Sequence, residues 1–271
     1  MEISYKELDE ISKIIYRTSG LYLQKRDKDK LLKYIEKKLA EGRFRSLEHF
    51  KKELEHSKSV LYEVFDVLTI NETFFFRHKS HFNILEKEIL PKLFKEKQSV
   101  KLWSAACSTG EEPYSMAITA LEVMEKLKIK KTVRVIANDI SQKVLKVAQE
   151  GVYGSYAIRF VPPDILKKYF IKQPDGKYKI SPKVKSMVRF MHLSLTDEAG
   201  MKRIGNDIDV VFCRNVLIYF DIESRKKALS LIHYNMNKGA YLFLGPAESA
   251  RGLIKGLKIV LFPGAIVYCK E

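Results

Sequence analysis

Residues 99–115 read Ser-Val-Lys-Leu-Trp-Ser-Ala-Ala-Cys-Ser-Thr-Gly-Glu-Glu-Pro-Tyr-Ser, and this stretch decides the fold. Residues 100–106 predict a buried strand, and the small residues 104–110 predict a tight loop that a ligand can approach closely. Thr109 and Glu112 have the spacing of a capping box, which predicts that a helix begins here. Doubly wound α/β folds bind nucleotide-like ligands with this succession of strand, tight loop and helix.

The same loop argues against a ligand that carries phosphate. The dinucleotide fingerprint has three glycines, whereas this loop has only Gly110, followed by Glu111 and Glu112. Two carboxylates would repel a pyrophosphate, but they would suit a positively charged ligand without phosphate, such as S-adenosylmethionine. We expect Glu111 to contact this ligand, the alternative being a solvated side chain, and Glu112 only to cap the helix.

The chain has 271 residues, of which 46% are hydrophobic, and a formal net charge of +16. Its length fits one large domain or two small ones with a sizeable core. The positive charge indicates an anionic partner, and nucleic acid, an acidic protein surface and anionic lipid are all open on this evidence. No apolar run approaches the length needed to cross a bilayer, so we expect no membrane insertion.

Cysteine and histidine positions bear on the compartment and on metal binding. Cys107, Cys213 and Cys269 are far apart and odd in number, which argues against a disulfide framework and fits a reducing cytoplasm. His78 and His81 lie three residues apart without a third ligand. We therefore interpret them as helix-surface residues and expect no metal site.

The pattern along the chain predicts three parts. Residues 1–70 read as an all-helical domain, and residues 71–98 as a linker with a connecting helix. Residues 99–271 alternate between strands and helices, which predicts a mainly parallel α/β sheet with an antiparallel pair at one edge. A small antiparallel β insert is expected at about residues 170–190. The predicted strands of the sheet are 100–106, 133–138, 188–192, 208–213, 240–245 and 265–269, with helices at 112–127, 141–150 and 222–237.

The second helix of the first part carries a basic face. Arg26, Lys30, Lys33 and Lys37 are spaced four, three and four residues apart, so they share one side of the helix. Such a face could dock on an acidic helix or on phosphates. The residues alone favour the plainer interpretation, a solvated face.

Polar side chains follow two of the predicted strands. Asp139 ends the second strand, where this architecture holds ribose hydroxyl groups; a helix cap is the alternative. Arg214 and Asn215 follow the strand 208–213, and Tyr219 lies four residues further on, within reach of a reacting group. Because the strand ends otherwise carry apolar residues, these side chains predict the wall of a pocket.

Asn71, Thr73 and Arg77 surround three consecutive phenylalanines at 74–76. The three rings cannot all face one side of a helix, so we expect at least one to pack on the next domain or on a ligand. Interdomain packing with polar residues at the surface is the alternative.

The sequence suggests no nucleophilic triad, no phosphate-binding loop and no general base. A methyl transfer to a carboxylate needs no base, because a glutamate side chain with a pKa of about 4 is already ionised at neutral pH. The protein has only to hold oxygen, methyl carbon and sulfur in line.

The chain resembles the CheR-type chemotaxis receptor methyltransferases over essentially its whole length. Three segments in order carry the resemblance: Asn71-x-Thr73-x-x-x-Arg77, residues 103–115, and residues 212–221, Phe-Cys-Arg-Asn-Val-Leu-Ile-Tyr-Phe-Asp. It implies a Rossmann-like methyltransferase domain that transfers a methyl group from S-adenosylmethionine to glutamates on the cytoplasmic helical bundle of chemoreceptors.

The resemblance also implies roles for individual residues. It places cofactor contacts at Asn71, Thr73, Arg77, Glu111, Asp139, Ser194, Leu195, Arg214 and Asn215. It places Arg77 and Tyr219 near the transferred methyl group, and it turns the basic face towards the acidic receptor.

The predicted β insert is similar in position to a β-subdomain that, in some members of the family, grips a pentapeptide tether with a glycine-rich loop. Here residues 180–186 read Ile-Ser-Pro-Lys-Val-Lys-Ser, without glycine. We therefore expect an enzyme that does not depend on the tether.

Two other functions compete with this one. A basic S-adenosylmethionine enzyme could methylate RNA or DNA. Amino-directed DNA enzymes usually carry an Asp/Asn-Pro-Pro-aromatic tetrad after the fourth strand, where this chain has Arg214-Asn-Val-Leu, so we expect no nucleic-acid substrate. The remaining alternative is a module that binds the cofactor as a sensor without catalysis.

Overall fold

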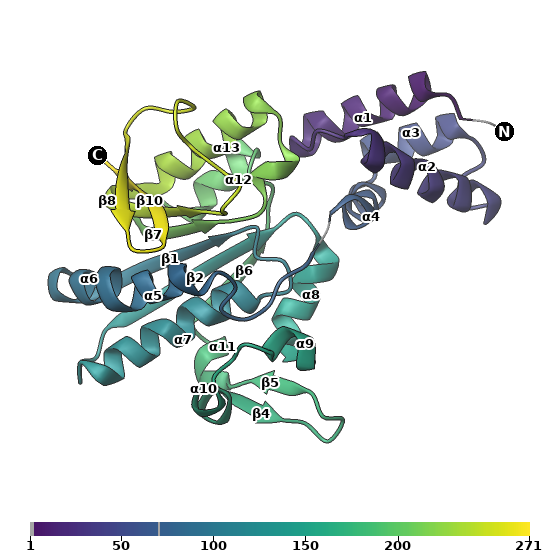
Figure 1. The fold of residues 1–271 in the computed structure, drawn as a ribbon. Helices are drawn as coiled ribbons and strands as arrows, with labels where there is room; N and C mark the ends of the chain where they lie inside the picture. The colour runs from purple at the N-terminus through teal and green to yellow at the C-terminus, as the bar shows by residue number, and fades with distance from the viewer. Residues whose placement is uncertain (1–2, 70) are drawn as a thin grey trace.

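The computed structural model describes residues 3–69 and 71–271. A seven-stranded sheet lies at its centre with helices on both faces, the N-terminal helices beyond one end and a small β insert below (Figure 1). The sheet order is β6-β2-β1-β7-β8-β10-β9. The strands are β1 (Ser99–Ala105), β2 (Thr132–Asp139), β6 (Val188–His192), β7 (Ile208–Cys213), β8 (Met236–Leu244), β9 (Leu257–Phe262) and β10 (Ala265–Lys270).

The strand β7 shows why the sheet forms the centre. All of its residues are buried. Val210 and Phe212 pack into the core on one face of the sheet, and Val211 and Cys213 into the core on the other. A strand that is apolar on both sides is typical of a parallel sheet covered by two helix layers. The mainly parallel α/β fold predicted from the sequence is confirmed.

The edge of the sheet is antiparallel, as expected. β6, β2, β1, β7 and β8 pair in parallel, whereas β10 pairs antiparallel with both β8 and β9. The last strand thus lies inside the edge, and β9 forms the edge itself.

Helices cover both faces. On one face lie α5 (Lys79–Ile84), the π-helical turn η1 (Leu85–Ile89), α6 (Leu90–Glu96) and α7 (Glu111–Lys126); the other carries α12 (Glu198–Met201), the 3-10 turn η2 (Lys202–Ile204) and α13 (Ile222–Asn235). α8 (Gln142–Glu150) follows β2, and η3 (Leu217–Tyr219) follows β7. Ser141 caps α8 and Asp221 caps α13, since each side chain accepts the backbone N–H three residues on.

The first part of the chain is helical, as predicted: α1 (Tyr5–Ser19), α2 (Lys25–Ala40), α3 (Leu47–His56) and α4 (Lys58–Leu68). The Ser4–Glu7 capping box and the Ser46 cap are both formed. The buried residues of these helices are continuous with the core on one face of the sheet. The predicted domain range 1–70 includes residues 1, 2 and 70, which lie outside the described residues, so the boundary stays a prediction.

The β insert is real, but its predicted bounds are wrong. Its sheet has the order β3-β5-β4, from β3 (Val152–Tyr153), β4 (Phe170–Lys172) and β5 (Tyr178–Ile180). α9 (Ser155–Ile158), α10 (Pro163–Tyr169) and α11 (Pro182–Lys185) complete it. The insert therefore begins before residue 170, and residues 188–190 belong to β6 of the main sheet.

The three phenylalanines at 74–76 divide between different neighbours. Phe75 is fully buried, edge-on to Tyr153 and Phe170 of the insert at 4.9 and 5.0 Å between ring centroids. The prediction that at least one ring packs on the following part of the chain is confirmed.

Within residues 3–69 and 71–271, no helix combines the length and the apolar character that a membrane span requires.

Candidate active site

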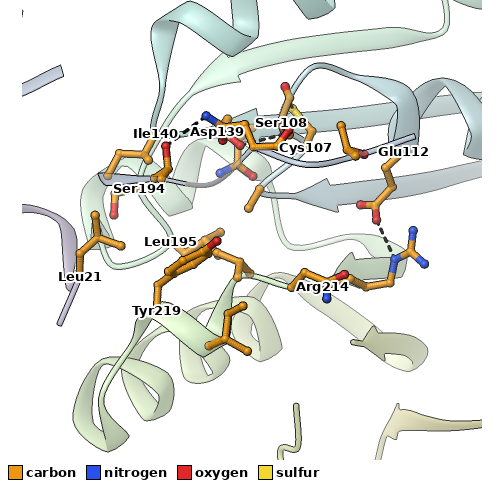
Figure 2. A pocket seen from close by; sticks show the side chains of 18 of the residues that line it. Leu21, Cys107, Ser108, Glu112, Asp139, Ile140, Ser194, Leu195, Arg214 and Tyr219 are labelled. Carbon is orange, nitrogen blue, oxygen red and sulfur yellow. Dashed lines mark hydrogen bonds and ion pairs between the residues drawn. The ribbon is translucent and has the colours of Figure 1, made fainter. Parts of the chain in front are cut away.

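A cavity of about 300 Å³ opens at the carboxyl ends of the parallel strands (Figure 2). Its size is at the lower end of the range for small-molecule sites. The lining includes these predicted site residues: Asn71, Thr73, Arg77, Asp139, Ser194, Leu195, Arg214, Asn215 and Tyr219. Glu111 and the basic face of α2 are not part of the lining.

The first loop places Asp139 at the cavity. The Asp139 carboxylate accepts the backbone N–H of Ser108 at 2.8 Å and of Ser141 at 3.0 Å, and it is 6% exposed. Burial raises the pKa of this carboxyl group, while the two N–H donors oppose the shift. The N–H of Cys107 donates to the carbonyl of Asn138. These loop donors are therefore engaged within the protein, consistent with a ligand that has no phosphate.

The structure places the two glutamates differently from what the sequence led us to expect. The helix α7 begins at Glu111 with Gly110 as its N-cap in the left-handed region (φ 94°), and no side chain caps it, so the predicted Thr109–Glu112 capping box is wrong. Glu111 is buried, and its carboxylate accepts the Thr109 hydroxyl at 2.6 Å. Glu112 instead lines the cavity.

Glu112 lies between two polar groups. Its carboxylate accepts the Ser104 hydroxyl at 2.6 Å. It also accepts the Arg214 Nε–H at 2.7 Å (Figure 2). Arg214 is 6% exposed, donates also to the carbonyl of Arg77 at 2.7 Å, and stacks on the Phe212 ring. A buried guanidinium needs such partners, because an unpaired buried charge is strongly destabilising.

Glu248, which the sequence did not single out, fixes the turn after β7. Its carboxylate accepts the backbone N–H groups of Asn215, Val216 and Leu217 at 2.7 to 2.9 Å and of Gly245 at 2.6 Å. This holds Asn215 at a φ of 60°, where it lines the cavity.

The N-terminal part contributes to the same cavity. Ser19, the last residue of α1, and Leu21, from the connection between α1 and α2, are lining residues. Leu21 forms a β-bridge with Phe220, and the N–H of Tyr22 donates to the carbonyl of Tyr219 at 3.0 Å. The wall therefore combines the helical part with the α/β part.

The lining fits S-adenosylmethionine by its chemistry. Glu72, Glu112 and Asp139 each bring a carboxylate to the cavity, and those of Glu112 and Asp139 are suited to a cationic donor and to ribose hydroxyl groups. Ile140, Leu193 and Leu195 add apolar surface suited to an adenine ring.

The basic face of α2 lies outside the cavity. Arg26, Lys33 and Lys37 are exposed and Lys30 is half-buried. The Lys30 Nζ lies 3.7 Å from an Asp27 carboxylate oxygen, and the Lys37 Nζ lies 3.8 Å from a Glu41 carboxylate oxygen.

The expectation that His78 and His81 are helix-surface residues is wrong. His81 is 6% exposed, its ring lies 5.3 Å from that of Phe243, and its Nδ1 has no hydrogen-bond partner in the described structure. Burial, together with the nearby positive charge of Arg214, lowers the pKa of His78 to about 4 and of His81 to about 3. Among the described residues, no group of three or more His, Cys, Asp or Glu could hold a metal ion.

These histidines predict acid sensitivity. An unfolded histidine takes up a proton below pH 6.5, whereas folded His81 does so only near pH 3, so the unfolded state binds more protons between these values. The free energy of unfolding has its full value above pH 6.5 and decreases as the pH falls below 6.5. For His81 alone the decrease is about 2 kcal/mol at pH 5. Urea unfolding of the wild type and of His81→Phe at pH 7 and pH 5 measures this decrease. If both proteins lose the same free energy of unfolding between pH 7 and pH 5, the role of His81 is contradicted.

Comparisons with known proteins agree with this geometry. The family model described as "CheR methyltransferase, SAM binding domain" matches residues 71–260. A chemotaxis protein methyltransferase of Borreliella burgdorferi is 34% identical, covering 93% of this chain and 91% of that protein. Chemotaxis protein methyltransferase 1 of Pseudomonas aeruginosa is 38% identical, covering 76% of each. With its cavity and three predicted motif segments, this chain belongs to the CheR family of S-adenosylmethionine-dependent chemotaxis methyltransferases.

Proposed function

We propose that this protein transfers the methyl group of S-adenosylmethionine to glutamate side chains of chemoreceptors. The observation that carries the proposal is that the described residues lining the cavity offer no general base free of other partners. No histidine lines it, and burial raises the pKa of the Cys107 thiol. Each lining carboxylate is already engaged, Glu112 by Arg214, Asp139 by two backbone N–H groups and Glu72 by the Tyr156 hydroxyl. An acceptor that is already ionised, such as a carboxylate, suits this lining.

The roles of the lining residues follow from this acceptor. The cofactor supplies an electrophilic methyl group on a positively charged sulfur. Glu112 and Asp139 bind its cationic and hydroxyl groups, and Arg77 and Tyr219 orient the acceptor carboxylate from the same cavity. Arg77 is itself positioned by its bond to the carbonyl of Glu72 at 2.7 Å. Catalysis then rests on alignment of the two reactants.

The test is incubation with cofactor labelled in the methyl group and with cytoplasmic fragments of chemoreceptors from the same organism. We expect label on glutamate that alkali releases as methanol. Label that resists alkali, or label found only on added RNA or DNA, would contradict the proposal.

We also propose that the enzyme does not depend on a receptor tether. Residues 180–186, where the family's glycine-rich loop is expected, here include the helix α11 and no glycine. Receptor fragments with and without a C-terminal pentapeptide should be methylated at equal rates, and a strong preference for the longer fragment would refute this.

The basic face of α2 is proposed to bind the acidic receptor. Arg26 and Lys33 are exposed, and neither has an ion pair in the described structure. Arg26→Glu with Lys33→Glu should lower kcat/KM for a receptor fragment about tenfold at low salt and less at high salt, because surface charges are screened. Affinity for S-adenosylhomocysteine, measured by calorimetry, should stay unchanged.

The matched control reverses two exposed lysines on the far side of the sheet. Lys87 and Lys95 lie on η1 and α6, away from α2 (Figure 1). If Lys87→Glu with Lys95→Glu slows methylation as much as the α2 variant does, only net charge matters and the face is merely solvated.

A further inference from the structure

The mouth of the cavity is marked by the lining residues that solvent reaches most. Among the described residues, Glu72 and Ile218 are the two that both line the cavity and are exposed. They come from different parts of the chain, the segment before α5 and the turn η3 after β7. We therefore take these two residues to mark the entrance of the cavity for an acceptor side chain.

Large apolar side chains stand exposed beside Ile218. Ile218 is 42% exposed, Tyr22 is 57% exposed and Ile222 is 59% exposed. Tyr22 is bonded through its N–H to the carbonyl of Tyr219, so it lies across from this lining tyrosine. Ile222 begins α13, two residues after the lining residue Phe220. We call Tyr22, Ile218 and Ile222 the first rim.

A second group stands beside Glu72. The Tyr156 hydroxyl donates to the Glu72 carboxylate at 2.6 Å, and Tyr156 and Phe160 are 56% and 61% exposed. The Arg159 guanidinium lies 3.7 Å from the Tyr156 ring centroid and 4.9 Å from that of Phe160. We call Tyr156, Arg159 and Phe160 the second rim.

The charge around the mouth of the cavity indicates which kind of partner fits there. The first rim is continuous in sequence with α2, since Tyr22 precedes the first residue of that helix, Lys25, by three positions. Arg26 and Lys33 on α2 are exposed, and Arg159 places a third exposed cation in the second rim. The surroundings of the mouth therefore combine exposed apolar side chains with positive charge, which suits a partner that combines apolar side chains with negative charge.

We propose that the two rims are the docking surface for the acceptor protein, and that the acceptor is an acidic amphipathic helix with apolar residues on both sides of its reacting carboxylate. This inference rests on the proposed function. A helix places residues three and four positions before and after the acceptor on the same face. These neighbours would cover the first rim on one side of the mouth and the second rim on the other, while acidic residues meet α2.

The test measures kcat/KM for a chemoreceptor cytoplasmic fragment from the same organism, with Tyr22→Ala, Ile222→Ala and Phe160→Ala made singly. The controls are Tyr234→Ala and Ile259→Ala, whose side chains are 59% and 45% exposed. Tyr234 is near the other end of α13, and Ile259 is on the edge strand β9. The controls thus remove comparable exposed apolar surface away from the mouth.

We expect each rim variant to lower kcat/KM about tenfold, mainly through KM, because a few central aromatic and apolar residues dominate most interfaces. The loss should persist at about 0.5 M salt, unlike that of the charge-reversed α2 variant. The affinity for S-adenosylhomocysteine should change less than twofold, and the controls should behave as wild type.

Two results would overturn the docking surface alone: rim variants that match the controls while wild type methylates the fragment, or rim variants that lose affinity for S-adenosylhomocysteine. If wild type itself places no alkali-labile label on the fragment, the proposed function fails and the docking surface fails with it.

Discussion

We expect Glu112→Gln to raise the Kd for S-adenosylmethionine about a hundredfold, and Glu111→Gln to change it less than about threefold. Glu112 lines the cavity and pairs with buried Arg214, whereas Glu111 is turned to the Thr109 hydroxyl. Removing the carboxylate that a cationic ligand group meets in a buried site costs about 2–5 kcal/mol of binding free energy, and about 2.7 kcal/mol corresponds to a hundredfold change in Kd. Calorimetric titration of both variants measures the difference.

The two variants control for each other, since they make the same change at adjacent positions. Equal losses would mean that the charge of the helix start matters rather than a contact in the cavity. A larger loss in Glu111→Gln would restore the expectation drawn from the sequence. Thermal unfolding without ligand separates affinity from stability, because Arg214 also loses its partner in Glu112→Gln.

The second large effect is expected from Asp139→Ala, which should weaken binding of the cofactor by about a hundredfold. The change removes the proposed partner of the ribose hydroxyl groups, and it leaves the N–H groups of Ser108 and Ser141 without their acceptor. A buried donor left unpaired costs about 1–3 kcal/mol. The loop should therefore lose its shape as well as its contact.

Asp66→Ala is the matched control for this loss. Asp66 accepts the hydroxyl of Ser141, so it contacts the same serine as Asp139, but it does not line the cavity. Calorimetry should show nearly wild-type affinity in Asp66→Ala. If the two variants bind the cofactor equally well, Asp139 acts only as a cap for the following helix.

The sequence predicted the sheet well because its strands carry strong signals. β7 is a short run of buried residues ended by a polar pair, and the capping residues Ser141 and Asp221 locate the helices that follow β2 and η3. β3 gave no such signal, since it is only two residues long and pairs with a strand more than twenty residues later. The insert was therefore predicted to begin too late.

The two glutamates show the limit of reading a site from spacing. A capping box and a glycine cap differ by one residue at the start of a helix, and one residue turns each side chain by about 100° around the axis. This shift decides whether Glu111 or Glu112 meets the cavity. The sequence could not predict the role of Glu248 for a related reason. Its backbone partners Asn215, Val216 and Leu217 lie more than thirty residues earlier in the chain.

The placement of Ser19 and Leu21 in the cavity wall has a consequence for dissection of the protein. A fragment reduced to residues 71–260 would keep the matched methyltransferase segment yet lack part of the chamber for its donor. Moreover, the chain that completes this chamber leads directly into α2. A partner that binds α2 is therefore connected through this segment to the wall of the S-adenosylmethionine site. A truncation between the two parts would disturb partner binding and cofactor binding together.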